Sequence, residues 1–505
     1  MMGSEKMRLV TDYLDHIVQE YPEKIAFANE QDSMTFSQVH ENARKVAVGL
    51  IKENIFKQPI VVFMEKSPIC ITSFLGVTYS GNFYTPIDTQ MPSSRIHKII
   101  NTLHPAVVIT NRMLLSSAEE AFDGYKILLY EDLQQNMADF EAIEAVRCRQ
   151  LDTDLLYVLF TSGSTGDPKG VTISHQAVID YTDWVTNAFD LDASTTLGNQ
   201  AALYFDLSIQ DVYAPLKTGA TTWLLEQEKF SFPIRLLEYL NEKEINTIFW
   251  VPSALVLVAN LKALRRVALP NLHKVLFCGE VMPNKQLNIW RNALPHAVFV
   301  NLYGPTEITE VCTYYRVERE FKDEDALPIG KNCENMEVFI LDEEDRLITG
   351  DEIGELCVRG RGLSYGYYNN SEKTAEAFVQ NPLQPNYHEI IYRTGDLVRY
   401  NEFGELMYAG RKDFQIKHMG HRIELGEIET AALAVEGVKQ ACCIYDTAHS
   451  RIVLFYSGSK NDEELKELLP TYIPHYMIPN QFVKMDEIPL NMNGKLDRVW
   501  LKSQL

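Results

Sequence analysis

The sequence predicts an α/β protein with a large first domain of mixed β-sheets and helices and a small α+β domain at the C-terminal end. A chain of 505 residues that is 46% hydrophobic can bury the cores of two or more domains. Residues 7–21 have apolar side chains at the i, i+3, i+4 spacing of an amphipathic helix. Helical stretches then alternate with short β-rich runs, as in βαβ units with largely parallel sheets. Such runs occur at residues 60–64, 106–110, 247–251 and 274–278.

The boundary of the second domain is expected near Asp413. A polar, turn-like stretch at residues 400–404 is followed by a short hairpin-like stretch that ends at 410–413. We therefore assign residues 1–412 to the first domain and 413–505 to the second. The second domain is expected to contain helices at 424–435 and 463–469, and strands at 441–445 and 452–456.

Composition and charge exclude several classes of function. The formal net charge of -22 argues against non-specific binding to nucleic acid or to an anionic membrane, because both need a basic footprint. No run approaches 18 uninterrupted apolar residues and the first ten residues have no apolar signal segment, so we expect a cytoplasmic protein. The eight cysteines lack CxxC or Cys/His ligand spacing, which predicts reduced, mostly structural thiols.

A loop of hydroxyls, glycines and one lysine follows the apolar strand predicted at residues 156–160. Glycines let backbone N–H groups approach an anion, hydroxyls donate hydrogen bonds, and Lys169 adds positive charge. Because Lys169 lies between a proline and a glycine, the loop is not of the Walker A type. The pattern predicts a phosphate-binding loop. Its sequence is Thr161-Ser162-Gly163-Ser164-Thr165-Gly166-Asp167-Pro168-Lys169-Gly170.

This loop resembles the signature of the adenylate-forming superfamily, which includes peptide-synthetase adenylation domains, D-alanine–carrier protein ligases, acyl-CoA synthetases and luciferases. The resemblance covers nearly the whole chain, because further motifs match in order. It implies the acyl-adenylate synthetase fold, with an ATP- and amino-acid-binding domain and a small mobile lid domain that rotates about a hinge at Asp413. The matching motifs are residues 79–88, 205–208, 301–307, 354–356, 392–397, 410–413, 420–427 and 493–498.

The resemblance implies that ATP and Mg²⁺ are bound. Glu307 would help to hold Mg²⁺, Thr306 would contact the α-phosphate, and Lys169 with the hydroxyl loop would hold the β- and γ-phosphates. Tyr303 would lie against the adenine, and Asp396 would accept hydrogen bonds from the ribose hydroxyls. The remaining implied nucleotide contacts are Thr161, Ser162, Gly163, Ser164, Thr165, Gly166, Gly279, Glu280, Asn301, Gly304 and Arg411.

Lys495 is implied as the main catalytic residue of adenylation, together with Lys169, Thr306 and Glu307. In the family this lysine bridges the substrate carboxylate and the α-phosphate from the lid domain. A carboxylate is a poor nucleophile toward ATP, so the site must neutralise charge in the pentavalent transition state. Because that charge builds up only in the transition state, loss of Lys495 is expected to lower turnover more than binding.

Asp206 is the most informative of the implied substrate-binding residues. In the amino-acid branch of the family this aspartate pairs with the substrate α-ammonium, and a buried carboxylate needs such a cationic partner. Cys278 and its neighbours are similar to D-alanine–carrier protein ligases, which favours D-alanine or another small amino acid. Gln210 and Glu310 depart from that pattern. If Glu310 faces the pocket, a cationic side chain such as that of ornithine or lysine becomes plausible. The other implied pocket residues are Leu207, Phe249, Leu276, Leu302 and Val311.

The resemblance implies an AMP-forming ligase that activates an amino acid and passes it to the phosphopantetheine thiol of a carrier protein. An acyl-CoA synthetase and a non-catalytic, nucleotide-binding scaffold are alternatives. Asp206 argues against the first, and the retention of Lys169, Glu307, Asp396 and Lys495 argues against the second.

An acidic carrier protein would need a local basic surface on an enzyme of this net charge. One cluster of basic residues near the predicted hinge is a candidate, and a solvated face of the lid domain is the alternative interpretation. The cluster comprises Arg411, Lys412, Lys417, His418, His421 and Arg422.

Overall fold

The computed structural model describes residues 7–137, 139–163, 167–490 and 496–505. The chain folds into two compact units. The predicted domain division at 413 stays a prediction, because two earlier segments group with the C-terminal residues. The first unit comprises Met1–Thr89, His104–Leu159 and Val171–Gly410, and the second comprises Gln90–Leu103, Phe160–Gly170 and Arg411–Leu505.

Among the described residues, the largest sheet has nine strands and belongs to the first unit. Its central strands are parallel, and each enters the sheet after a helical connection, as predicted for βαβ units. In spatial order the strands are β15 (Lys331–Asn332), β14 (Thr313–Arg316), β13 (Val298–Tyr303), β12 (Lys274–Cys278), β11 (Thr247–Trp250), β9 (Thr196–Asn199), β10 (Thr221–Leu224), β1 (Ile25–Ala28) and β2 (Ser33–Thr35).

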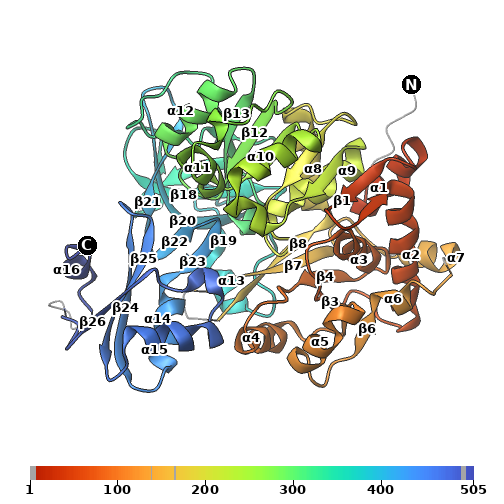
Figure 1. Ribbon diagram of the computed structural model, residues 1–505, viewed down its shortest axis with the longest axis horizontal. Helices are drawn as coiled ribbons and strands as arrows, with labels where there is room; N and C mark the ends of the chain where they lie inside the picture. Colours follow the sequence, from red (N-terminus) through yellow and green to blue (C-terminus); the bar gives the residue numbers. More distant parts are fainter. Residues whose placement is uncertain (1–6, 138, 164–166, 491–495) are drawn as a thin grey trace. The chain divides into compact units, whose positions relative to one another are not determined.

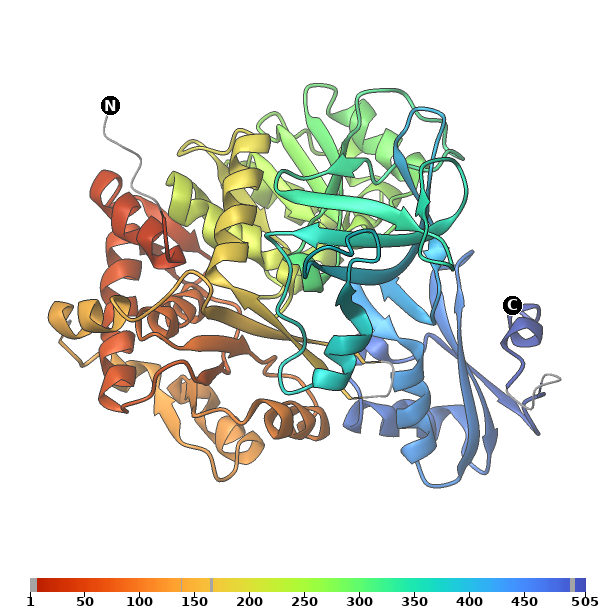
Figure 2. The same cartoon turned by 180° about the vertical axis from the view of Figure 1, so that it is seen from behind.

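Two further sheets each contain six described strands. The first is largely parallel, and its strands are β6 (Ile127–Leu129), β5 (Val107–Thr110), β3 (Pro59–Val62), β4 (Phe83–Pro86), β7 (Leu155–Thr161) and β8 (Lys169–Ser174). The second is antiparallel and is drawn mainly in teal in Figure 2. Its strands are β17 (Leu347–Ile348), β16 (Met336–Leu341), β18 (Gly354–Gly360), β20 (Ile390–Tyr400), β19 (Phe378–Gln380) and β21 (Leu406–Arg411).

The predicted amphipathic helix at residues 7–21 is confirmed as α1 (Val10–Glu20), whose apolar face is buried. Helix α1 packs on α9, and α9 packs on α8 (Figure 1). The other helices of the first unit are α2 (Phe36–Lys52), α3 (Pro68–Tyr79), α5 (Leu115–Ala121), α6 (Tyr130–Leu133), α7 (Phe140–Arg147), α8 (His175–Ala188), α9 (Ile209–Thr218), α10 (Pro233–Glu242), α11 (Pro252–Asn260), α12 (Asn284–Ala293) and α13 (Ser371–Ala377).

The second unit has its own buried core, which includes Ile423, Ile428 and Leu454. Arg95 and Glu427 form a buried ion pair within this unit. The helices and strands predicted for the C-terminal region are confirmed to within a few residues, as is the α/β class. The elements are α4 (Ser93–Leu103), β22 (Gln415–His418), β23 (His421–Glu424), α14 (Leu425–Ala434), β24 (Val438–Asp446), β25 (Arg451–Gly458), α15 (Asp462–Leu468), β26 (Gln481–Met485) and α16 (Arg498–Lys502).

The cysteine side chains are mostly buried. Seven of the eight free cysteines are buried, which fits a structural role, and Cys148 is exposed. Cys442 and Cys443 are buried residues of β24 (Val438–Asp446). No helix in the described part of the chain is long and apolar enough to cross a membrane.

Candidate functional site

The predicted phosphate-binding loop begins where β7 ends. The Oγ1 atom of Thr161, the last residue of β7, is buried without a hydrogen-bond partner among the described residues. The hydroxyl of Ser162 donates to the backbone oxygen of Arg422 across 2.7 Å, within the second unit. A Cβ on Gly163 would lie 2.0 Å from the backbone oxygen of Asp167, so the path of the loop requires glycine there. Lys169 begins β8, and Ser164, Thr165 and Gly166 lie outside the described residues.

Two predicted nucleotide-binding residues are joined within the first unit. Tyr303 ends β13 and Asp396 lies on β20, 93 residues later in the chain. The Tyr303 hydroxyl donates a hydrogen bond to Oδ2 of Asp396, and both side chains are buried. The backbone N–H of Asp396 donates to Thr394 Oγ1 across 3.0 Å, which further fixes the strand at this point. The residues that the sequence assigns to the adenine and to the ribose are therefore in direct contact.

Glu307 lies fully buried in the short 3₁₀ helix Thr306–Ile308, which follows β13. Its Oε1 atom accepts a hydrogen bond of 2.8 Å from the hydroxyl of Tyr367, and its backbone oxygen accepts one of 2.9 Å from the N–H of Ser364. Mg²⁺ in nucleotide sites is usually bound through one or two carboxylates and the substrate phosphates. One oriented carboxylate near hydroxyl groups therefore fits the Mg²⁺ role that the sequence predicts for Glu307.

The backbone turns sharply after Glu307. Thr309 and Glu310 have φ angles of 59° and 76°, a left-handed conformation that costs about 1–3 kcal/mol for residues other than glycine. The turn is held by the Thr309 hydroxyl, which donates to the backbone oxygen of Gly362 across 2.7 Å. A Cβ on Gly304 would lie 2.3 Å from the backbone oxygen of Glu310, so the turn requires a glycine at 304. These contacts fix the backbone conformation at Glu310.

Four predicted pocket residues share one face of the large sheet. Phe249 of β11 pairs with Leu276 of β12, and Cys278 of β12 pairs with Leu302 of β13. Leu276 and Cys278 are two residues apart on one strand, so they point to the same side. All four are buried. The carboxyl ends of these parallel strands are where open α/β sheets bind ligands. The structure thus brings the predicted apolar pocket residues together, and Leu207 and Val311 are buried as well.

The polar pocket residues lie nearby in the same unit. Asp206 begins the 3₁₀ helix Asp206–Ser208, and its Oδ1 accepts a hydrogen bond from the N–H of Leu207 across 3.0 Å. Gln210 and Glu310 are completely buried, and their side-chain oxygen and nitrogen atoms have no hydrogen-bond partner among the described residues. Burial raises the pKa of the Tyr157 hydroxyl, and the carboxylates of Asp206 and Glu310 raise it further, so both carboxylates act on the same buried group.

The structure adds residues that sequence reasoning missed. Tyr367 contacts Glu307, while Tyr157 and Tyr181 lie close to Glu310. Tyr157 is part of the apolar strand before the phosphate loop. Its hydroxyl is the only polar side-chain group at residues 156–160, and it was the only feature that could have drawn attention to this position. Tyr181 lies on α8, which carries no recognisable motif, so nothing in the local sequence identifies it.

The remaining predicted residues make structural contacts. The left-handed φ of 99° at Gly279 forms the turn after β12, and Oε2 of Glu280 accepts a hydrogen bond from the N–H of Ser253. Asn301 donates to the backbone oxygen of Pro328 across 2.8 Å. In the second unit, Arg411 and Asp413 form a two-pronged ion pair with N–O distances of 2.6 and 2.7 Å. Lys495 lies outside the described residues.

Two histidines do not fit the predicted basic surface. His418 is buried on β22, and burial lowers the pKa of His421 to about 3, with His418 as a second cause. His421 also stacks on Tyr476, with ring centroids 3.8 Å apart. Because it is uncharged near neutral pH, His421 adds no positive charge to the surface, and the prediction is wrong for these two residues. Lys412 is exposed, as a basic docking surface requires.

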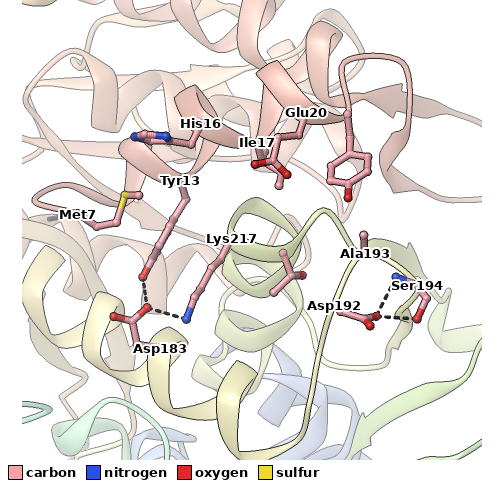
Figure 3. Close-up of a pocket in the computed structure, with 12 residues that line it drawn as sticks. Met7, Tyr13, His16, Ile17, Glu20, Asp183, Asp192, Ala193, Ser194 and Lys217 are labelled. Atoms are coloured by element: carbon pink, nitrogen blue, oxygen red, sulfur yellow. Dashed lines mark hydrogen bonds and ion pairs between the residues drawn. The ribbon is translucent and has the colours of Figure 1, made fainter. Parts of the chain in front are cut away.

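A separate cavity of about 640 Å³ lies at α1, α8 and α9, and Figure 3 shows its lining. Lys217 Nζ lies 2.8 Å from Oδ1 of Asp183, and the Tyr13 hydroxyl donates to the same atom across 2.7 Å (Figure 3). Asp192 accepts hydrogen bonds from the backbone and the hydroxyl of Ser194. None of the predicted site residues lines this cavity, so we do not assign the reaction to it.

Comparison with known proteins agrees with this arrangement. Residues 14–368 match the family model described as AMP-binding enzyme, and residues 427–495 match the one described as AMP-binding enzyme C-terminal domain. Zwittermicin A synthase ZmaJ of Bacillus cereus is 32% identical, with 94% of this chain and 91% of that protein covered. D-alanine--D-alanyl carrier protein ligase of Bacillus licheniformis is 31% identical over 99% of this chain and 100% of that protein.

A solved structure extends the comparison to the fold. The Vibrio cholerae adenylation domain AlmE, in complex with glycyl-adenosine-5'-phosphate, superimposes with a TM-score of 0.85 at 22% identity, covering 100% of this chain and 99% of that one. The fold of the two proteins is therefore the same. The family models together span most of the sequence, and the phosphate-binding loop with the motifs at 79–88, 205–208, 301–307 and 354–356 falls inside the first of them. This chain belongs to the AMP-binding enzyme family, the adenylate-forming enzymes that its sequence resembles.

Proposed function

We propose that this protein is an AMP-forming ligase that activates the carboxylate of an amino acid with ATP and transfers the aminoacyl group to a phosphopantetheine thiol of a carrier protein. The observation that carries the proposal is that Asp206 begins a 3₁₀ helix whose next residue, Leu207, lies 3.9 Å from a Cβ built on Gly279, directly after β12. An amino acid brings the cation that such a carboxylate needs, whereas a fatty or aryl acid does not. The names of the two relatives above, a synthase and a carrier protein ligase, are in keeping with this class.

In the first half-reaction a carboxylate oxygen of the amino acid bonds to the α-phosphorus of ATP, and pyrophosphate leaves. Asp206 orients the amino acid through its α-ammonium. The hydroxyl of Thr161 and the ammonium of Lys169 bind the outgoing phosphates, and Asp396 holds the ribose. Most of the rate gain in such a reaction comes from positioning and from charge stabilisation.

Mg²⁺ would be held by Glu307 and the ATP phosphates, and it would neutralise negative charge on the phosphate oxygens. The hydrogen bond from Tyr367 orients the Glu307 carboxylate. Thr306, in the same 3₁₀ helix, would contact the α-phosphate, as the resemblance implies. Lys495 would supply the remaining positive charge.

In the second half-reaction the thiolate of the carrier attacks the carbonyl carbon of the aminoacyl adenylate, and AMP leaves. By resemblance, rotation of the C-terminal domain about Asp413 separates the two steps. The tight ion pair between Asp413 and Arg411 would hold the hinge in one of its states. Because the reaction consumes ATP, the proposal includes a cytoplasmic location.

Exchange of labelled pyrophosphate into ATP tests the proposal. Purified protein with Mg²⁺ and ATP is assayed against single D- and L-amino acids, acetate and a medium-chain fatty acid. Exchange that depends on one or a few amino acids is expected. Exchange that depends on acetate or the fatty acid instead would identify an acyl-CoA synthetase. Nucleotide binding without exchange for any acid would indicate a non-catalytic scaffold.

A further inference from the structure

We infer that the amino acid taken by this site is a short diamino acid, whose side-chain amino group is bound by Glu310. The inference rests on the proposed function, since it assigns the side chain of the amino acid that Asp206 would bind through its α-ammonium. Glu310 is the residue that suggests it, because the methyl side chain of alanine offers a carboxylate no hydrogen-bond donor or positive charge.

Glu310 is a buried carboxylate that the described residues leave without a cationic partner. It is only 1% exposed, and neither Oε1 nor Oε2 makes a hydrogen bond of standard geometry among the described residues, although the Tyr181 hydroxyl is close enough to act on its pKa as a hydrogen-bond donor. Burial raises the pKa of Glu310 well above its usual range, and the nearby Asp206 carboxylate raises it further. The Tyr181 hydroxyl acts in the opposite direction. An unsatisfied buried polar group costs about 1–3 kcal/mol, so its retention calls for an explanation.

Asp211 is another buried carboxylate, and its contacts can be compared with those of Glu310. Asp211 accepts a hydrogen bond of 2.8 Å from the amide of Asn199, and the side-chain oxygen of Asn199 accepts one of 3.2 Å from the ammonium of Lys66. Burial raises the pKa of Asp211 to about 7, and the Asn199 hydrogen bond and the Lys66 ammonium act against this, so a cation of the same protein partly compensates Asp211. No lysine, arginine or histidine of the described residues bonds to a carboxylate oxygen of Glu310 or lowers its pKa. The missing cation would come from a ligand.

Two buried tyrosine hydroxyls interact with Glu310. Neither the Tyr157 nor the Tyr181 hydroxyl makes a hydrogen bond of standard geometry among the described residues. Tyr157 is electrostatically coupled to both Asp206 and Glu310, and Tyr181 is coupled to Glu310. An ammonium has three donor hydrogens and needs several oxygen acceptors. A carboxylate with two phenol oxygens beside it is a suitable set.

The direction of Glu310 is fixed by a strained turn. Left-handed backbone conformations at Thr309 and Glu310 persist because Gly304 allows a close approach of the chain and Gly362 accepts the Thr309 hydroxyl. Such strain concentrates at ligand sites, where the surrounding structure holds it. A surface loop would relax it. The protein therefore holds Glu310 in the interior, toward Asp206 and the tyrosines.

The substrate would have to satisfy both carboxylates. Burial raises the pKa of Glu310 and the Asp206 carboxylate raises it further, so the two groups interact, and both also act on the buried Tyr157 hydroxyl. With the α-ammonium at Asp206, a second amino group on a short side chain can reach Glu310. A methyl side chain would leave Glu310 buried and unpaired. This combines the small substrate that Cys278 favours with the polar residues that a D-alanine pocket does not need.

The test compares matched pairs of substrates in pyrophosphate exchange. The diamino acids 2,3-diaminopropionate, 2,4-diaminobutyrate, ornithine and lysine are assayed in both stereochemical forms against 2-aminobutyrate, norvaline, norleucine and alanine. We expect one short diamino acid to exceed its neutral counterpart by at least about 100-fold in kcat/KM, because a site built for a polar group rejects an analogue without it. Glu310→Gln should reduce that ratio to within about threefold of one. Glu352→Gln, an exposed glutamate, is the matched control and should leave the ratio unchanged.

Calorimetry gives a second readout that does not depend on turnover. A Glu310 that is protonated in the free protein and ionised beside a bound ammonium releases a proton on binding. The binding enthalpy of the diamino acid should therefore depend on the ionisation enthalpy of the buffer near neutral pH, and this dependence should be absent in Glu310→Gln. If the variant does not fold, the panel on the unaltered protein decides alone.

The outcomes separate this inference from the proposed function. Exchange with alanine or another neutral amino acid, with all diamino acids inactive, would overturn the inference and leave the proposed function standing. Equal use of diamino acids and their neutral counterparts would also overturn it. No exchange with any amino acid would overturn the proposed function.

Discussion

The hydroxyl of Tyr367 donates a hydrogen bond of 2.8 Å to Oε1 of Glu307, although the two residues are 60 positions apart in the chain. Both side chains are buried. Neighbours that orient a metal-binding carboxylate typically contribute 10- to 100-fold to metal affinity. Tyr367 is therefore a positioning residue for the proposed Mg²⁺ site.

Replacing Tyr367 by phenylalanine removes that hydrogen bond and keeps the ring. We expect the Mg²⁺ concentration for half-maximal pyrophosphate exchange to rise about tenfold, with a smaller change in the rate at saturating Mg²⁺. Tyr368→Phe, at the next position, is the control. A lowered rate with an unchanged Mg²⁺ dependence would show that Tyr367 acts only on stability.

Replacing Gly304 by alanine tests the turn that directs Glu310. The added Cβ would meet the backbone oxygen of Glu310 at 2.3 Å, so the backbone must shift. We expect the free energy of unfolding to fall by about 1–3 kcal/mol and exchange activity to be lost. Urea unfolding and pyrophosphate exchange measure the two effects. Gly350→Ala is the matched control, because its nearest neighbour to an added Cβ is 3.9 Å away. Equal behaviour of the two variants would argue against a constrained turn.

The stability of the protein should fall as the pH is lowered through the range of one buried histidine. Burial lowers the pKa of His175 from 6.5 to about 4, and its Nδ1 accepts a hydrogen bond from the N–H of Val10. The unfolded chain therefore binds a proton that the folded protein excludes. The contribution of the neutral His175 to the free energy of unfolding is fully present above pH 6.5. It is lost progressively toward pH 4, by up to about 3 kcal/mol.

His175→Asn isolates this contribution, because the amide oxygen can accept the same hydrogen bond. Urea unfolding at pH 7.5 and pH 5 should show a smaller pH dependence for the variant than for the unaltered protein. His421, whose pKa is also lowered, acts in the same direction and remains in both proteins. An identical pH dependence in the two proteins would reject the assignment to His175.

Lys495→Ala should separate the two half-reactions. Its ammonium is proposed to stabilise charge that exists only in the transition state of adenylation. Pyrophosphate exchange should fall by about 100-fold or more, while transfer of a supplied aminoacyl adenylate to the carrier thiol should be largely kept. Lys502→Ala, close in sequence but outside the motifs, is the control. Equal losses in both half-reactions would contradict the role of Lys495.

Local patterns predicted the elements well. The apolar spacing before residue 21 became α1 (Val10–Glu20), and the run at 274–278 became β12 with the same ends. Both signals depend only on which side of a helix or strand is buried, which neighbouring residues determine. The order of the strands in the sheets was not predictable, because β9 lies between β10 and β11 through contacts that have no local signature.

In the candidate site, too, residues within motifs could be predicted from the sequence, whereas their distant partners could not. Motif positions predict Asp206, Glu307 and Asp396 as site residues, since the chemistry restricts the residue type at each. The partners Tyr367 and Tyr181 come from distant segments, and only the folded chain shows what they contact. His418 and His421 were placed on a basic surface because charge in a sequence says nothing of burial, and the structure buries His418 and stacks His421 on a tyrosine.

The most direct test of the account is formation of AMP and exchange of pyrophosphate by the purified protein with Mg²⁺, ATP and a mixture of amino acids, compared with Asp206→Asn. We predict exchange for the unaltered protein and for Asp351→Asn, an exposed control, and a loss of at least about 100-fold for Asp206→Asn. Full activity of Asp206→Asn, or no AMP from any amino acid with the unaltered protein, would contradict the claim that this site adenylates an amino acid.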